Sequence, residues 1–145
     1  MQNGLFITLE GGEGAGKSSC AQFLHSALQE RKIPTILTRE PGGTFTGQKI
    51  REMVCERNAY TELDSTAELF LLMADRAQHV AMKIKPALQN NFVVICDRFI
   101  DSTHAYQGAG KGHSHDIIEK LNNLATNGLI SDRTYLLSIS PEIGM

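Results

Sequence analysis

Tryptophan, proline and cysteine are scarce in this chain, and the pattern of the cysteines excludes two kinds of structural site. The 145 residues include no tryptophan, four prolines and three cysteines, and aromatic residues make up 6%. Cys20, Cys55 and Cys96 are odd in number and far apart, and none belongs to a C-x-x-C pair. A disulfide framework and a structural zinc site are therefore not expected, and the pattern is typical of reduced thiols in the cytosol.

An excess of one charge and a long apolar run are also missing. The formal net charge is −2, which does not indicate a surface for nucleic acid or for an anionic membrane. No apolar run approaches the roughly 20 residues that a membrane-spanning helix needs. Because residues 5–9 already form an apolar strand pattern, we expect no secretory signal. With 41% hydrophobic and 21% charged residues, we expect residues 1–145 to form a single globular domain in the cytoplasm.

The most informative feature that is present is a glycine-rich segment that matches G-x-x-x-x-G-K-[ST]. Residues 5–9 before it predict a buried strand, and residues 19–31 after it predict a helix. Such a phosphate loop wraps its backbone N–H groups around the phosphates of a nucleotide at a helix N-terminus. We therefore expect the chain to bind a nucleoside triphosphate through Gly11, Gly12, Glu13, Gly14, Ala15, Gly16, Lys17, Ser18 and Ser19. Lys17 would reach the β- and γ-phosphates, and the Ser18 hydroxyl would be a Mg²⁺ ligand.

Strand and helix patterns alternate along the rest of the chain. Apolar runs predict strands over residues 34–38, 92–97 and 134–139. Helical periodicity predicts helices over residues 48–57, 62–89 with a bend near Pro86, and 114–126 with Ser114 as a cap. This alternation predicts an α/β fold of the phosphate-loop NTPase type, with a doubly wound parallel sheet and helices on both faces.

Polar motifs stand where three of the predicted strands end. The phosphate loop follows the first strand, Arg39-Glu40-Pro41 follows the second, and Asp97-Arg98 ends the third. Asp97 matches the position of an acid that helps to hold Mg²⁺. Ligands bind at the carboxyl ends of parallel strands, so we expect these groups to converge on one site.

Arginines recur in these loops: Arg39, Arg51, Arg76 and Arg98 exceed what one triphosphate needs. The surplus suggests that the acceptor is itself a phosphate, whose oxygen needs no general base at neutral pH. The residues alone therefore favour a kinase that phosphorylates a nucleotide. A deoxynucleoside kinase, with Glu40 as general base, and a non-catalytic nucleotide-binding module stay open as alternatives.

Four segments together make the chain resemble the bacterial thymidylate (dTMP) kinases. They are residues 10–18, the Thr38-Arg39-Glu40-Pro41-Gly42-Gly43-Thr44 segment, Asp75-Arg76-Ala77-Gln78-His79, and residues 96–108, which include Asp97-Arg98 and Tyr106-Gln107-Gly108. The resemblance covers essentially the whole chain. It implies transfer of the ATP γ-phosphate to dTMP with Mg²⁺, giving dTDP for DNA precursor synthesis, usually in a cytosolic homodimer.

The resemblance also implies roles for individual residues. Lys17, Arg98 and Glu13 are the expected catalytic residues, with Glu13 near the sugar and phosphates of the acceptor. Arg51 and Arg98 would grip the dTMP phosphate, Arg76 would hydrogen-bond the thymine ring, and Thr103 and Tyr106 would line the base and deoxyribose. The residues expected to bind the substrate are Glu40, Arg51, Leu72, Arg76, Arg98, Thr103 and Tyr106, and the metal ligands are Ser18 and Asp97. The peptide before Pro41 is a candidate for the cis form.

The chain departs from the family pattern in three places. Leu72 stands where the family usually has a phenylalanine that stacks on thymine, so weaker stacking is expected. Ser138 and Ser131 stand where the family commonly has Asp and Pro. The sequence stops at Met145, before the family's arginine-bearing lid and last strand, so we expect the 145 residues alone to turn over poorly.

Overall fold

The computed structural model describes residues 4–12, 14–56 and 62–138, and these form two compact units. The first unit comprises residues 1–39, 86–102 and 130–145, and the second comprises residues 40–85 and 103–129. The two units are described separately below. The expectation of a single domain stays a prediction.

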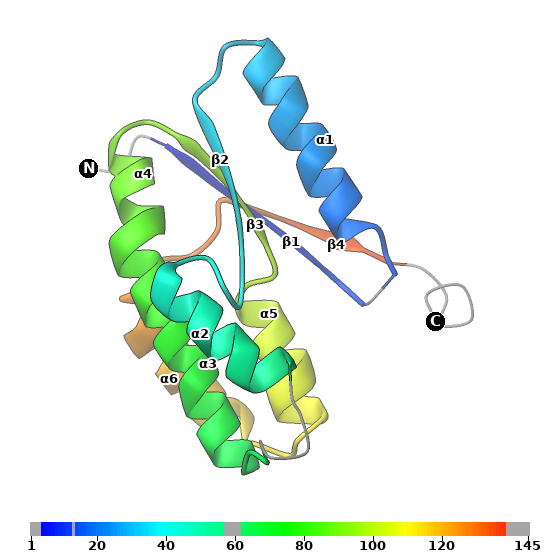
Figure 1. Cartoon of the computed structure of the whole chain (residues 1–145), viewed down its shortest axis with the longest axis vertical. Coiled ribbons are helices and arrows are strands. Elements are labelled where there is room, and N and C mark those ends of the chain that lie inside the picture. The colour runs from blue at the N-terminus through cyan, green and yellow to red at the C-terminus, as the bar shows by residue number, and fades with distance from the viewer. Residues whose placement is uncertain (1–3, 13, 57–61, 139–145) are drawn as a thin grey trace. The chain divides into compact units, whose positions relative to one another are not determined.

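The first unit is built on a four-stranded, wholly parallel sheet in the order β2-β3-β1-β4 (Figure 1). Its strands are β1 (Leu5–Gly11), β2 (Thr35–Arg39), β3 (Val93–Asp97) and β4 (Arg133–Leu137). The central strands β1 and β3 are almost entirely buried, as expected of continuous apolar runs between parallel neighbours. In register, Leu9 lies opposite Asp97, and Asp97 lies opposite Arg39. The carboxyl ends of these three strands therefore share one edge of the sheet.

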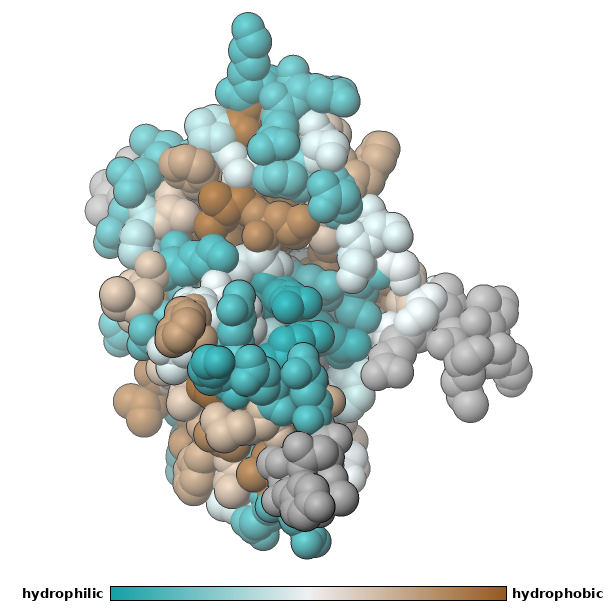
Figure 2. Space-filling view, viewed as in Figure 1, coloured by the Kyte–Doolittle hydropathy of each residue, from teal (hydrophilic) through white to brown (hydrophobic). Residues whose placement is uncertain are grey.

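Helix α1 (Lys17–Glu30) covers one face of this sheet. Its apolar face, which includes Ala21, Leu24 and Leu28, packs on Ile7, Leu9 and Ile95 of the strands. Apart from the exposed Phe23, the opposite face of the helix is mostly polar, and its exposed C-terminal end forms the hydrophilic top of Figure 2. This amphipathic pattern fixes which side of α1 meets the sheet, and with it the direction in which the preceding loop leaves β1.

The second unit is helical. It contains α2 (Phe45–Cys55), α3 (Ser65–His79), the π-helical turns η1 (Val80–Ile84) and η2 (His104–Ala109), and α6 (His115–Thr126). Leu69 and Met73 of α3 pack against Ile118 of α6 to form its apolar core. Side-chain oxygens cap the N-termini of all three α-helices, since Thr44 accepts from Gly47 N–H, Asp64 from Thr66 N–H and Ser114 from Ile117 N–H. Two short helices, α4 (Lys85–Gln89) and α5 (Ile100–Thr103), carry the chain from one unit to the other.

Most predicted elements are confirmed within two or three residues at each end. The parallel sheet, the capping role of Ser114 and the cis Glu40–Pro41 peptide are also confirmed. The long helix predicted over residues 62–89 begins at Ser65 and is interrupted by η1 immediately before α4, which contains Pro86. The helical segment 100–109 was not predicted. Among the helices of the described residues, none combines the length and the apolar character needed to cross a membrane.

Candidate functional site

The phosphate loop connects β1 to α1 and takes its shape from glycines. Gly16 directly precedes the helix with φ 88°, Gly14 has φ 75°, and both values lie in the left-handed region that favours glycine. Gly11 has φ 148°, and a Cβ there would lie 2.5 Å from the Leu137 carbonyl oxygen. Side chains at these positions would therefore strain the backbone or clash with β4. Glu13, the expected catalytic acid of the loop, lies outside the described residues.

Lys17 is the first residue of α1, and its side chain turns back over the loop. Its Nζ donates a hydrogen bond to the Gly12 carbonyl oxygen at 2.8 Å. The first amides of a helix, here those of Lys17, Ser18 and Ser19, have no carbonyl partner within the helix, and the helix dipole favours an anion beside them. An ammonium group held over such an N-terminus is suited to phosphate oxygens.

Ser18 and Asp97 meet at the ends of α1 and β3, as the sequence predicts for a metal site. Ser18 Oγ donates to Asp97 Oδ2 at 3.2 Å. Asp97 Oδ1 is buried and has no hydrogen-bond partner among the described residues. A hydroxyl beside a carboxylate with a spare oxygen is a donor set of the kind that Mg²⁺ takes. These two residues therefore fit the expected ion.

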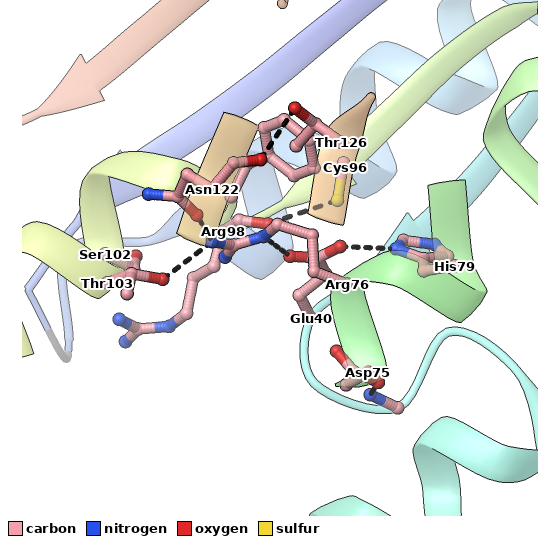
Figure 3. A network of polar contacts seen from close by, with 12 residues as sticks. Glu40, Asp75, Arg76, His79, Cys96, Arg98, Ser102, Thr103, Asn122 and Thr126 are labelled. Atoms are coloured by element: carbon pink, nitrogen blue, oxygen red, sulfur yellow. Dashed lines mark hydrogen bonds and ion pairs between the residues drawn. The ribbon is translucent and has the colours of Figure 1, made fainter. Parts of the chain in front are cut away.

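In the second unit, Arg76 of α3 is the centre of a buried polar cluster (Figure 3). Its Nε donates to Glu40 Oε1 at 2.8 Å, and its Nη1 donates to Thr103 Oγ1 at 2.8 Å and to Asn122 Oδ1. The Arg76 side chain is only 5% exposed, so its charge depends on these acceptors. Two other expected substrate-binding residues, Glu40 and Thr103, thus contact Arg76 directly.

Glu40 uses both of its oxygens within this cluster. Oε1 accepts from Arg76, and Oε2 lies 2.8 Å from Nδ1 of His79, whose side chain is fully buried. Burial pushes the pKa of Glu40 upward, but the charges and hydrogen bonds of Arg76 and His79 outweigh it and hold the pKa below its usual range. Glu40 is therefore an ionised anchor for Arg76. This arrangement does not suit a general base, which needs an oxygen open to substrate.

Asp75, the neighbour of Arg76 in sequence, is a second buried carboxylate. Its Oδ1 accepts from Gly42 N–H at 3.0 Å, which ties α3 to the loop after Glu40. Burial, together with the negative charge of Glu40, raises the pKa of Asp75 to about 6, although Gly42 N–H, His79 and Arg76 act in the opposite direction. A Cβ on Gly47 of α2 would lie 2.3 Å from the same Oδ1, so a glycine is required for this close approach.

The pKa of Asp75 gives folding a dependence on pH that Asp75→Asn should remove. Since the pKa is higher in the folded chain than the value of about 3.9 in unfolded peptides, the folded state binds the proton more tightly. The resulting stabilisation is complete below about pH 4 and is lost as the pH rises through 6. We expect the unfolding free energy of the wild type, relative to Asp75→Asn, to fall by up to about 3 kcal/mol between pH 4 and 7 in urea titrations. A difference that does not change with pH would contradict this.

The other expected substrate-binding residues are divided between the two units, with Arg51, Leu72 and Tyr106 in the second and Arg98 in the first. Arg51 of α2 donates from Nη1 to the Pro41 carbonyl oxygen at 2.9 Å, next to Glu40. Leu72 lies one turn before Arg76 on α3 and is half-buried, and Tyr106 in η2 is 46% exposed. Arg98 lies in the first unit, directly after Asp97 at the end of β3.

The sequence did not single out Asn122 or His79 as functional residues. Asn122 lies on the buried face of α6, four residues after Ile118 and four before Thr126, both of which are buried. A polar residue on an otherwise buried helical stripe needs a partner, and this was the signal available in the sequence.

Comparisons with known proteins identify the family of the chain. The sequence profile of the family described as "Thymidylate kinase" matches residues 9–145. The chain is 47% identical over 145 residues to the thymidylate kinase of Hahella chejuensis, covering 100% of this chain and 69% of that protein. It is 45% identical over 141 residues to that of Gloeobacter violaceus, covering 97% and 66%. The chain therefore spans about two thirds of the length of these curated relatives.

A solved structure gives the same result for the fold. The crystal structure of thymidylate kinase from Ehrlichia chaffeensis superposes with a TM-score of 0.87 at 37% sequence identity, covering 98% of this chain and 76% of that one. This match confirms the phosphate-loop α/β fold, and the shared name of the relatives confirms the expected class, a nucleoside monophosphate kinase acting on dTMP. The sequence, the fold and the phosphate loop together establish that the chain belongs to the thymidylate kinase family.

Proposed function

We propose that this chain transfers the γ-phosphate of ATP to dTMP and gives dTDP and ADP. A phosphate oxygen of dTMP forms the new bond to the γ-phosphorus, and the bond from that phosphorus to the β–γ bridging oxygen breaks. The observation that carries the proposal is the buried Arg76, held by Glu40, Thr103 and Asn122 in a family whose members are thymidylate kinases. For the individual residues, we propose the same roles as those expected from the sequence.

Lys17 and the amides at the start of α1 would bind the triphosphate of ATP. Ser18 and Asp97 would hold Mg²⁺, which when bound supplies positive charge to the phosphates. Arg98 and Arg51 would bind the acceptor phosphate, bringing two polyanions together against their repulsion. Glu13 is proposed to act near the acceptor, as the family pattern implies.

The second unit offers groups suited to the edge of a thymine ring. Arg76 is a fixed cationic donor, and two buried side-chain amide atoms of the same unit have no hydrogen-bond partner among the described residues. They are the Gln107 Oε1 acceptor and the Asn122 Nδ2 donor. A pyrimidine with an N–H group between two carbonyls presents the complementary donor and acceptors. A buried amide atom without a partner costs free energy that a ligand could recover, and this supports a pyrimidine dione as the base.

The proposal extends to the setting of the enzyme. We place it in the cytoplasm as a homodimer that acts on a small-molecule substrate, without nucleic-acid or membrane partners. The reduced state expected for Cys20, Cys55 and Cys96 and the near-neutral net charge support this setting.

A thermal-melt panel tests the proposed substrate. Because a ligand that binds only the folded state raises the melting midpoint, dTMP should raise it more than dUMP, dCMP, AMP or thymidine at equal concentration. A shift with Mg-ATP and none with dTMP would contradict the proposal and favour a non-catalytic nucleotide-binding module. A shift with thymidine that equals the shift with dTMP would favour a deoxynucleoside kinase.

A further inference from the structure

Arg98 has a backbone conformation that side chains rarely adopt. Its φ is 73°, in the left-handed region, which costs a residue with a Cβ about 1–2 kcal/mol. Two of the other non-glycine residues with positive φ are asparagines, Asn91 and Asn127, which tolerate this region. Arg98 lacks that tolerance, so its neighbours must hold the turn in place.

The peptide groups on both sides of Arg98 are fixed by hydrogen bonds. Arg98 N–H donates to the Leu9 carbonyl oxygen at 2.9 Å, and Cys96 Sγ donates to the Arg98 carbonyl oxygen at 3.1 Å (Figure 3). The next amide, that of Phe99, donates to the Glu10 carboxylate at Oε1. Leu9 and Glu10 of β1 therefore accept the hydrogen bonds of two consecutive amides in this turn.

Glu10 is also bonded to the start of the following helix. Ser102 Oγ lies 3.2 Å from Glu10 Oε1 and 3.3 Å from Oε2. The carboxylate is buried, at 3% exposure, and directly precedes Gly11 of the phosphate loop. Burial raises its pKa, while Phe99 N–H and Ser102 counteract this and Asp101 adds to it. This buried carboxylate accepts hydrogen bonds from two residues, Phe99 and Ser102, that closely follow one arginine, which points to a role in placing that arginine.

We propose that Glu10 is a positioning residue that fixes the left-handed turn at Arg98 and thereby aims its guanidinium group at the acceptor phosphate. The inference rests on the proposed function, which assigns that phosphate to Arg98. Glu10 directly precedes Gly11 of the phosphate loop at the end of β1. The end of this one strand therefore positions both the donor-phosphate loop and the Arg98 side chain.

Two substitutions, Glu10→Gln and Glu10→Ala, differ in whether they keep a hydrogen-bond acceptor at this position. In Glu10→Gln, Oε1 still accepts from Phe99 N–H, and the Ser102 hydroxyl can rotate to accept from the new amide. In Glu10→Ala, the Phe99 N–H and the Ser102 hydroxyl lose their acceptor, and the turn loses its support. Gln should therefore largely rescue the effect of Ala.

The test measures the dissociation constants of dTMP and thymidine by calorimetry on the full chain. Glu10→Ala should weaken dTMP by about tenfold or more and thymidine by less than about twofold, since only dTMP carries the phosphate. Glu10→Gln should stay within about threefold of the wild type for dTMP. In an Arg98→Ala background, Glu10→Ala should cause no further loss.

Equal weakening of dTMP and thymidine, or a further loss in the Arg98→Ala background, would overturn the inference and leave Glu10 a purely structural role. If Glu10→Ala does not fold, Ser102→Ala takes its place. A loss confined to dTMP then supports the inference, and no loss overturns it. Failure of the proposed function looks different, because the wild type would then bind dTMP no more tightly than thymidine. That result would overturn both.

Discussion

Replacing Glu40 by alanine is expected to lower the free energy of unfolding by about 3–5 kcal/mol, measured by urea titration at pH 7. The substitution leaves the buried Arg76 guanidinium without its carboxylate partner, which lies at 2.8 Å, and removes the anion beside His79. An unpaired buried cation costs more than the pair contributes, which is why the loss should be large. Binding of dTMP should also weaken, since Arg76 would lose its fixed direction.

Two controls separate this effect from a general loss of charge. Glu40→Gln keeps an acceptor for Arg76 Nε and should lose less stability. Glu52→Ala removes an exposed carboxylate of α2 that lies 3.6 Å from Lys49, and it should change stability by less than about 0.5 kcal/mol. Because the pKa of Glu40 is lowered in the folded state, its contribution is present at neutral pH and is lost as the pH falls through that pKa. Equal losses in Glu40→Ala and Glu52→Ala would show that the cluster does not stabilise the fold.

Replacing Lys17 by methionine is expected to weaken Mg-ATP binding by about 100-fold or more. The Lys17 ammonium group already lies over the loop, where it donates to the Gly12 carbonyl oxygen, and a charge-assisted contact with phosphate is worth about 3 kcal/mol. Methionine fits the buried stem of Lys17 without a charge, so the chain should still fold. Calorimetry with Mg-ATP measures the effect.

The matched control for Lys17→Met is dTMP binding to the same variant. Lys17 lies in the first unit, and the expected base-binding residues Arg76 and Thr103 lie in the second, so the melting shift with dTMP should be retained. Unchanged Mg-ATP affinity would contradict the role of Lys17. Loss of both ligands would point to misfolding of the variant.

The first unit could be predicted from the sequence almost completely. An apolar strand, a glycine loop and an amphipathic helix are local patterns, and each determines its own conformation. Because parallel strands end at one edge, the approach of Ser18 to Asp97 followed from the alternation of strands and helices alone.

The second unit could be predicted less well, because its contacts depend on packing between helices that are far apart in the sequence. Asn122 is 46 residues from Arg76, and no local pattern says which face of α6 meets α3. The short helical stretch over residues 100–109, which begins in the first unit and continues in the second, contains glycine and β-branched residues, which are poor helix formers. Part of its start is held by Glu10, 92 residues from Ser102, so its local propensity could not reveal it.

The shared register of β1, β2 and β3 limits where this chain can change in length. Leu9, Asp97 and Arg39 lie side by side in one row of the sheet, and side chains alternate between its faces. An inserted or deleted residue within any of these strands would turn every later side chain of that strand to the wrong face, including Glu10 in β1 or Asp97 in β3. Loops elsewhere can absorb such a change at small cost. Natural variants and engineered libraries should therefore tolerate insertions after α1 far better than within the strands.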